Sequence, residues 1–228
     1  MNDNTLLDFA GDLLPGLLVS FQLTVATLVF GIPLGIVLAL GLRETNMLVR
    51  APAMAVVEIG RGFPVLVILY LMYFGLPQVS ITPTAMIAAV AGLAISFGAY
   101  TSEAFRAGLA AVPVGQYEAG LSIGLSVFAL YRKVLLPQAI KIVVPPLIGW
   151  SIVYFQTTSL AYAIAVPELM SRAYTLATSN FQYLYMLGLA AFMYAAVSIP
   201  LSLISERLNN RSPRKARTIG TTVATPTL

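Results

Sequence analysis

Long apolar runs alternate with short polar segments along most of this chain. Four long stretches carry no charged residue, and a helix needs about 20 mostly apolar residues to cross a bilayer. One stretch, residues 62–102, is too long for a single crossing, and the turn residues Gly75, Pro77 and Pro83 divide it. None of the runs alternates like the strands of a membrane barrel. The pattern therefore predicts an all-α integral membrane protein with five transmembrane helices, at about 13–42, 52–75, 83–105, 138–166 and 178–205.

Composition agrees with a membrane protein and excludes several kinds of chemistry. Only 10% of the residues are charged, against about 25% in soluble domains. The chain has no cysteine and no histidine, which excludes disulfides, thiol chemistry and the commonest metal ligands. Glu103 and Glu118 lie fifteen residues apart in a polar loop, so nothing pairs them as acid and base. A phosphate-binding loop with Gly-Lys-Ser/Thr is absent from the sequence. We expect no enzyme activity, no catalytic residue, no metal site and no cofactor in this chain.

The basic residues are distributed unevenly between the two sides of the predicted helices. Of the thirteen Lys and Arg residues, only Arg172 falls on one side. The side rich in Lys and Arg is normally cytoplasmic. We therefore predict an outer N-terminus and a cytoplasmic C-terminus, with residues 1–208 as the transmembrane domain and 209–228 as a disordered cytoplasmic tail. Most of the chain's excess of basic over acidic residues comes from this one side of the membrane, so no nucleic-acid partner is expected.

The polar loop at about 106–137 contains local signals for two short helices. Pro113 suits the first turn of a helix over residues 114–121, because its missing N–H is not needed there. Gly120 and Gly124 favour a turn. Ser126 is a suitable N-cap for a second helix ending near Lys133. The loop would then form an elbow of two helices along the cytoplasmic membrane surface; an ordinary solvated loop is the alternative.

The same loop resembles the signature loop of the inner-membrane permease subunits of ATP-binding-cassette importers. That pattern is Glu-Ala-Ala, three residues, Gly, nine residues, Ile, one residue and Leu-Pro. Two positions of this chain differ, with Gly120 for the second Ala and Val134 for Ile. The resemblance implies that the loop couples the permease to an ATPase, through Glu118, Ala119, Gly120, Gly124, Leu136 and Pro137.

Other segments resemble the polar amino acid subfamily of these permeases. Residues 61–67 read RGFPVLV and residues 99–108 read AYTSEAFRAG, and both are similar to that subfamily's sequences around the same helices. The likeness extends over about 21–208. A Gly31/Gly35 pair in the first helix suits close helix packing rather than a specific dimer contact.

Two groups of polar residues within or beside the predicted helices are candidates for a substrate pathway. Gln156, Thr157, Thr158 and Ser159 lie near the middle of the fourth helix, at the position where the subfamily has Lys-Asp/Asn-Thr-Ser-Leu. Ser and Thr could instead bond to their own backbone. Glu58 and Arg61 are three residues apart and could pair on one helix face, or could reach the membrane surface separately.

The resemblance implies the permease subunit of an ATP-driven importer for polar amino acids in the bacterial inner membrane. The implied partners are a second permease subunit, identical or related, two cytoplasmic ATPase subunits that carry ATP and Mg, and an extracytoplasmic solute-binding protein. A permease for methionine or another small nutrient is the alternative within this class. An ATP-independent channel is the alternative outside it.

Overall fold

The structure is a computed structural model that describes residues 6–210. These residues form helices joined by short turns, with no strand among them. In chain order the elements are α1 (Leu6–Gly41), α2 (Met47–Gly62), α3 (Val65–Tyr70), η1 (Leu71–Gly75), η2 (Leu76–Val79), α4 (Ala85–Ala110), α5 (Val114–Ser122), α6 (Val127–Leu130), η3 (Tyr131–Leu135), α7 (Leu136–Thr157), η4 (Thr158–Ile164), α8 (Leu169–Asn180) and α9 (Tyr183–Asn210). The predicted all-α fold is confirmed. Most of the tail predicted at 209–228 lies outside the described residues.

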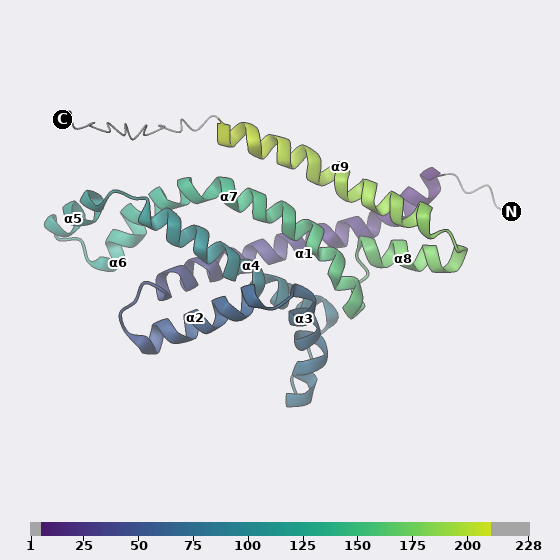
Figure 1. Ribbon diagram of the computed structural model, residues 1–228, viewed down its shortest axis with the longest axis horizontal. Helices are drawn as coiled ribbons and strands as arrows, with labels where there is room; N and C mark the ends of the chain where they lie inside the picture. Colours follow the sequence, from purple (N-terminus) through teal and green to yellow (C-terminus); the bar gives the residue numbers. More distant parts are fainter. Residues whose placement is uncertain (1–5, 211–228) are drawn as a thin grey trace, which may run out of the picture.

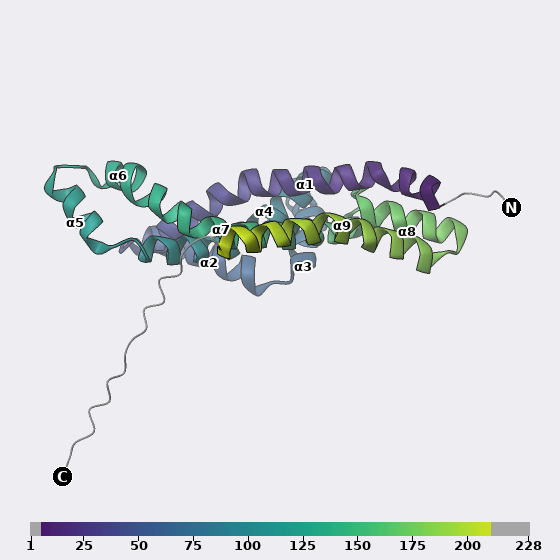
Figure 2. The same cartoon turned by 90° about the horizontal axis from the view of Figure 1, so that it is seen from above.

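The long helices α1, α4, α7 and α9 run roughly along the long axis of the molecule (Figure 1). Helices α5 and α6 form one end, and α8 lies beside the start of α1 at the other end, in both views (Figure 2). Within residues 6–210, four helices are long and apolar enough to cross a membrane, and α2 with α3–η2 makes a fifth if that bent pair is counted as one. This agrees with the five predicted transmembrane helices.

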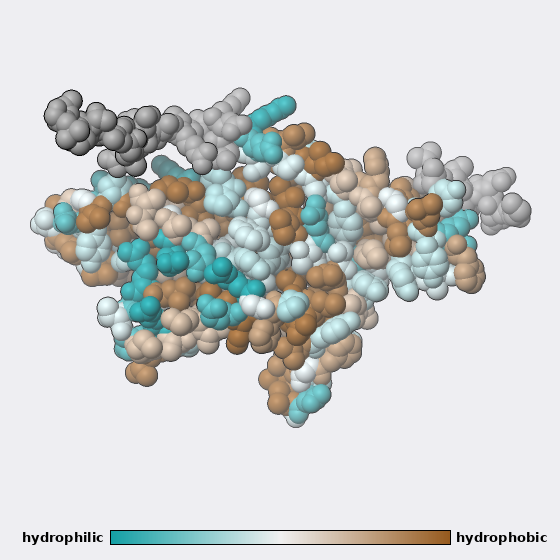
Figure 3. All heavy atoms as spheres, in the orientation of Figure 1, coloured by the Kyte–Doolittle hydropathy of each residue, from teal (hydrophilic) through white to brown (hydrophobic). Residues whose placement is uncertain are grey.

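The second predicted span, 52–75, is not one straight helix. The chain bends by 113° between Met47–Gly62 and Val65–Val79. Phe63 ends α2 in an extended conformation, with φ −90° and ψ 140°, because the ring of Pro64 disfavours helical geometry in the residue before it. The segment from α3 to η2 therefore leaves the bundle at its side (Figure 1). Its exposed residues include Tyr70, Leu71 and Phe74, and Figure 3 shows this projection as largely hydrophobic.

Other helix bounds also differ from the predicted spans. The fourth span was expected at 138–166, but α7 ends at Thr157 and continues as the 3₁₀ helix η4. The fifth was expected from 178, which lies inside α8; Phe181 adopts a left-handed φ of 56°, and α9 begins at Tyr183. Helix α4 reaches Ala110, so the loop begins later than 106. The changes at Thr157 and Phe181 occur without glycine or proline at the break, so apolar length does not reveal them.

Close packing of α1 against α4 forms the centre of the bundle. A Cβ atom on Gly35 would lie 3.1 Å from the Gly98 carbonyl oxygen and would collide with Thr101 Oγ1. Gly31 likewise faces Phe97. The Gly31/Gly35 pair therefore serves helix packing within the chain, as the sequence indicated. Beside this contact lies the largest group of buried residues, which includes Leu23, Leu69, Leu93, Phe97, Tyr154 and Ile164.

Candidate functional site

The predicted turn between two helices is present and is built around Gly124. The second helix does not end near Lys133 as predicted, because α6 continues without a break through η3 into α7. Helix α5 ends with Leu125 N–H donating to the Gly120 carbonyl at 3.1 Å and Gly124 N–H donating to the Leu121 carbonyl at 3.0 Å. This pair of bonds is the Schellman arrangement, which places a residue with positive φ just beyond the helix. Gly124 has φ 78°. Ser126 Oγ then accepts a hydrogen bond from Ala129 N–H at 3.3 Å, so it caps α6 as predicted.

Gly120 explains one departure from the importer pattern. A Cβ atom on this buried glycine would collide with Leu130 Cδ1 of α6. The two short helices therefore lie so close that an alanine here would require the Leu130 side chain to move. Gln138 Nε2 donates to Gln116 Oε1 at 3.2 Å and to the Val134 carbonyl at 3.0 Å, which ties α5 to the first turn of α7. Leu136 and Pro137 begin α7 and connect the elbow directly to a long helix.

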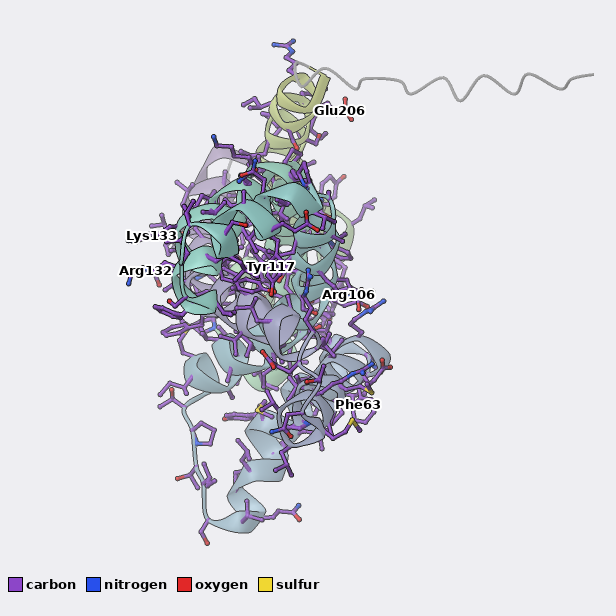
Figure 4. All side chains as sticks on the ribbon, turned by 90° about the vertical axis from the view of Figure 1, so that its left-hand side faces the viewer. Phe63, Arg106, Tyr117, Arg132, Lys133 and Glu206 are labelled. Atoms are coloured by element: carbon purple, nitrogen blue, oxygen red, sulfur yellow. The ribbon has the colours of Figure 1, made fainter. Side chains whose placement is uncertain are left out.

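The tip of the elbow exposes both apolar and charged residues. Val114, Ile123 and Phe128 are each more than 70% exposed, and Glu118 and Ala119 are also exposed. Figure 4 looks onto this end of the molecule, with Arg132 and Lys133 extending outward on one side and Arg106 on the other. Exposed apolar residues that form a contiguous patch mark a contact surface for another protein or for a membrane.

Arg61 does not pair with Glu58, contrary to the sequence-based hypothesis. Its Nη1 lies 3.2 Å from Glu103 Oε1, and Glu103 also binds Arg106 through its second oxygen at 2.5 Å. The Arg61 guanidinium lies 5.9 Å from the centre of the Tyr100 ring. Glu58 is exposed and forms no ion pair within the described residues. Helix α4 packs beside α2 and brings in a better-placed carboxylate than the one on the same helix.

A pair of double-mutant cycles tests this assignment. Arg61→Ala combined with Glu103→Ala should give a coupling of about 0.2–1 kcal/mol in thermal unfolding, since the pair is partly exposed. The matched cycle of Arg61→Ala with Glu58→Ala should be additive. Coupling in the Glu58 cycle with none in the Glu103 cycle would show that Arg61 pairs with Glu58 on its own helix.

The four polar residues of the fourth span do not converge on one site. Thr157 Oγ1 donates to the Val153 carbonyl at 2.8 Å, and Thr158 Oγ1 donates to the Phe155 carbonyl at 2.7 Å. Thr158 is fully buried, whereas Ser159 is half-buried. Gln156 is exposed, and its amide has no hydrogen-bond partner among residues 6–210. Gln156 is therefore the member available to a ligand or another chain.

Arg61 and Glu58 form no ion pair or side-chain hydrogen bond with this cluster among residues 6–210. Tyr100, beside Arg61, stacks on Trp150 of α7 with ring centres 4.7 Å apart. Trp150 precedes Gln156 by six residues, which is about 9 Å along a helix. A second chain of contacts links the same helices nearer the core, from Tyr154 to Ser96 at 2.8 Å and from Ser96 to the Gly60 carbonyl at 2.9 Å.

Sequence reasoning missed Glu168, which is fully buried where α1, α8 and α9 meet. Its carboxylate accepts from Met170 N–H at 2.8 Å and Ser171 N–H at 2.7 Å, which caps α8. It also accepts from Tyr194 Oη at 2.7 Å and from Ser20 Oγ at 3.4 Å. Burial raises the pKa of this carboxyl, and the four hydrogen bonds oppose that rise. An acidic residue directly before a helix is a cap signal that could have identified it.

A bundle of apolar helices with a helical elbow at one end defines a multi-pass membrane component. The family of binding-protein-dependent transport system inner membrane components matches residues 31–218, and the chain belongs to that family. The probable amino-acid ABC transporter permease protein YckA of Bacillus subtilis (strain 168) is 36% identical over 79% of this chain and 78% of YckA. The L-cystine transport system permease protein TcyB of the same organism is 32% identical over 87% of this chain and 86% of TcyB.

A solved structure has the same fold. The crystal structure described as an amino acid ABC transporter with histidines matches with a TM-score of 0.80 and 29% identity, over 90% of this chain and 96% of that one. The resemblance to importer permeases that the loop sequence indicated is confirmed by these comparisons. The fold and the family agree on a multi-pass permease subunit.

Proposed function

We propose that this chain is the membrane permease of an ATP-driven importer for polar amino acids. The elbow around Gly124 supports this most directly, because two capped helices with exposed apolar residues project from one end of the bundle. The permease relatives whose names specify amino acids support the substrate class. A second permease, identical or related, completes the translocation path, and an extracytoplasmic solute-binding protein delivers the substrate.

The elbow is the proposed docking site for cytoplasmic ATPase subunits, which bind ATP and Mg and carry out hydrolysis. Glu118, Ala119, Gly120, Gly124, Leu136 and Pro137 form or support this surface. Gly120 and the Gln116–Gln138 bond hold the elbow rigidly on α7. Closure of the ATPases then moves α7 as a rigid body, and alternating access follows from rocking of the helices. In this proposal the N-terminus is outside and the elbow and C-terminus are cytoplasmic, as the basic residues predict.

The test is reconstitution of the full chain in proteoliposomes with its ATPase and solute-binding protein. Uptake of a polar amino acid should require ATP and all three components. A panel that includes methionine separates the polar amino acid class from the alternative nutrient. Flux that persists without ATP or ATPase would mean that the protein is a channel.

Gln156 is the proposed polar contact along the pathway, with Thr157 and Ser159 beside it. Gln156→Leu removes the amide at similar size and should reduce uptake or raise the half-saturating concentration by roughly fivefold, the effect of one hydrogen bond. Val153→Leu, one turn earlier on an exposed position of α7, is the matched control and should leave uptake unchanged. Unaltered kinetics for Gln156→Leu across several amino acids would exclude this contact.

A further inference from the structure

A recess with a mixed polar and apolar lining lies between α1 and α8. These two helices meet at the end of the molecule opposite the elbow (Figures 1 and 2). The volume of the recess is about 400 Å³. The lining residues are Asp12, Pro167, Ser171, Arg172, Thr175 and Leu176. It shares no residue with the elbow or with the polar cluster around Gln156.

The local fold positions this recess rigidly. Glu168 fixes the first turn of α8, and Leu169 N–H donates to Ser20 Oγ of α1 at 3.3 Å. Gly16 allows the two helices to approach, since a Cβ atom there would lie 2.9 Å from Leu169 Cα and 2.8 Å from Arg172 Cδ. The aliphatic part of Arg172 therefore lies over Gly16, at the wall of the recess.

The charges of the recess are not satisfied by each other. Asp12 and Arg172 both line it, yet they form no ion pair within the described part of the chain. Arg172 Nε is buried and has no hydrogen-bond partner there. The buried Nε is closed to a ligand, but Arg172 as a whole is half-buried and lines the recess, so a ligand there would meet the rest of its guanidinium. The acceptor that a guanidinium fits best is a carboxylate.

We propose that this recess binds the main-chain groups of a free α-amino acid, with the carboxylate on Arg172 and the ammonium group on Asp12. The proposal rests on the proposed function, and it adds an outer receiving site to the pathway. One cation and one anion in a single recess match a zwitterion. An acidic side chain of a partner protein would satisfy Arg172 but would face Asp12 unfavourably. Pro167 and Leu176 provide an apolar wall for the amino-acid side chain, and the volume suits a small molecule.

The absence of cysteine from this chain allows a test that reports on the recess alone. Thr175→Cys, in the full chain assembled in nanodiscs with its ATPase, provides one exposed thiol at the recess. Glutamine, used as the probe, should slow labelling of this thiol by a methanethiosulfonate reagent by roughly tenfold at saturation. Thr82→Cys, exposed in the turn before α4 and outside both the recess and the elbow, is the matched control and should label at the same rate with or without glutamine.

Two further comparisons identify the groups involved. Arg172→Gln in the Thr175→Cys background should weaken protection by roughly tenfold or more, the effect of losing a charge-assisted hydrogen bond. N-acetylglutamine, which lacks the ammonium group, and glutaminamide, which lacks the carboxylate, should both protect the thiol poorly. Asp12→Asn should reduce the discrimination against N-acetylglutamine. ATP-driven uptake measured on the same protein keeps the proposed function separate. ATP-driven uptake without protection of the Thr175→Cys thiol by glutamine would overturn the receiving site and leave the proposed function intact. Protection of the thiol by the solute-binding protein alone would also overturn it, because the recess would then be a docking surface for that protein.

Discussion

Gly124→Val should nearly abolish uptake while the protein still inserts into the membrane. Position 124 has φ 78°, and a β-branched residue resists that region at a cost of about 1–3 kcal/mol. The two hydrogen bonds that end α5 depend on this conformation. That cost would lower the population of the elbow in its docking geometry by roughly 5- to 150-fold. The measurements are ATP-driven uptake, co-purification of the ATPase and the amount of permease in the membrane.

Two variants separate the turn from side-chain volume. Gly115→Val adds the same side chain to α5 in open space, so it should retain most uptake. Gly124→Asn should keep part of the activity, because asparagine tolerates a left-handed conformation better than valine does. Normal uptake and normal ATPase binding by Gly124→Val would remove the elbow from the coupling mechanism.

The elbow was predictable from the sequence because its signals are local. Pro113, Gly124 and Ser126 each act on the backbone next to them, so their spacing alone gives the helix, the turn and the cap. The break in the second span also had a local signal in Pro64. The prediction of that span relied on the length of the apolar run instead of on Pro64. Hydropathy alone does not distinguish a straight helix from a bent one of equal length.

The contacts of the charged residues were not predictable, because they depend on which helices are neighbours. Helical spacing in the sequence favours Glu58 as the partner of Arg61, and only the packing of α2 against α4 brings Glu103 to it instead. Thr158 and Gln156 are both polar and two residues apart, yet one is buried and the other is exposed. The change from α7 to a 3₁₀ helix at Thr158 alters the direction in which successive side chains point.

Glu168→Ala should destabilise the protein strongly and reduce uptake with it. The change leaves the N–H groups of Met170 and Ser171 without their side-chain acceptor, and it leaves the hydroxyl of Tyr194 with only a long contact to Ser20 Oγ at 3.5 Å. Lost capping and unsatisfied buried donors together amount to roughly 3–5 kcal/mol. Thermal unfolding in detergent measures this, and Glu206→Ala, an exposed acid near the end of α9, is the control that should shift little.

Glu168→Gln separates the charge from the contacts. The glutamine amide keeps one acceptor oxygen but turns an NH₂ toward groups that are themselves donors, so a smaller loss than with alanine is expected. Burial raises the pKa of Glu168 above its ordinary value of 4.5, so the folded protein binds this proton more tightly than the unfolded chain does. Its stabilising contribution is therefore complete below pH 4.5 and declines as pH rises through the raised pKa. The unfolding temperature of the wild-type protein should fall more over that range than that of Glu168→Gln, which cannot titrate; parallel pH profiles for the two proteins would show that the carboxyl has no raised pKa.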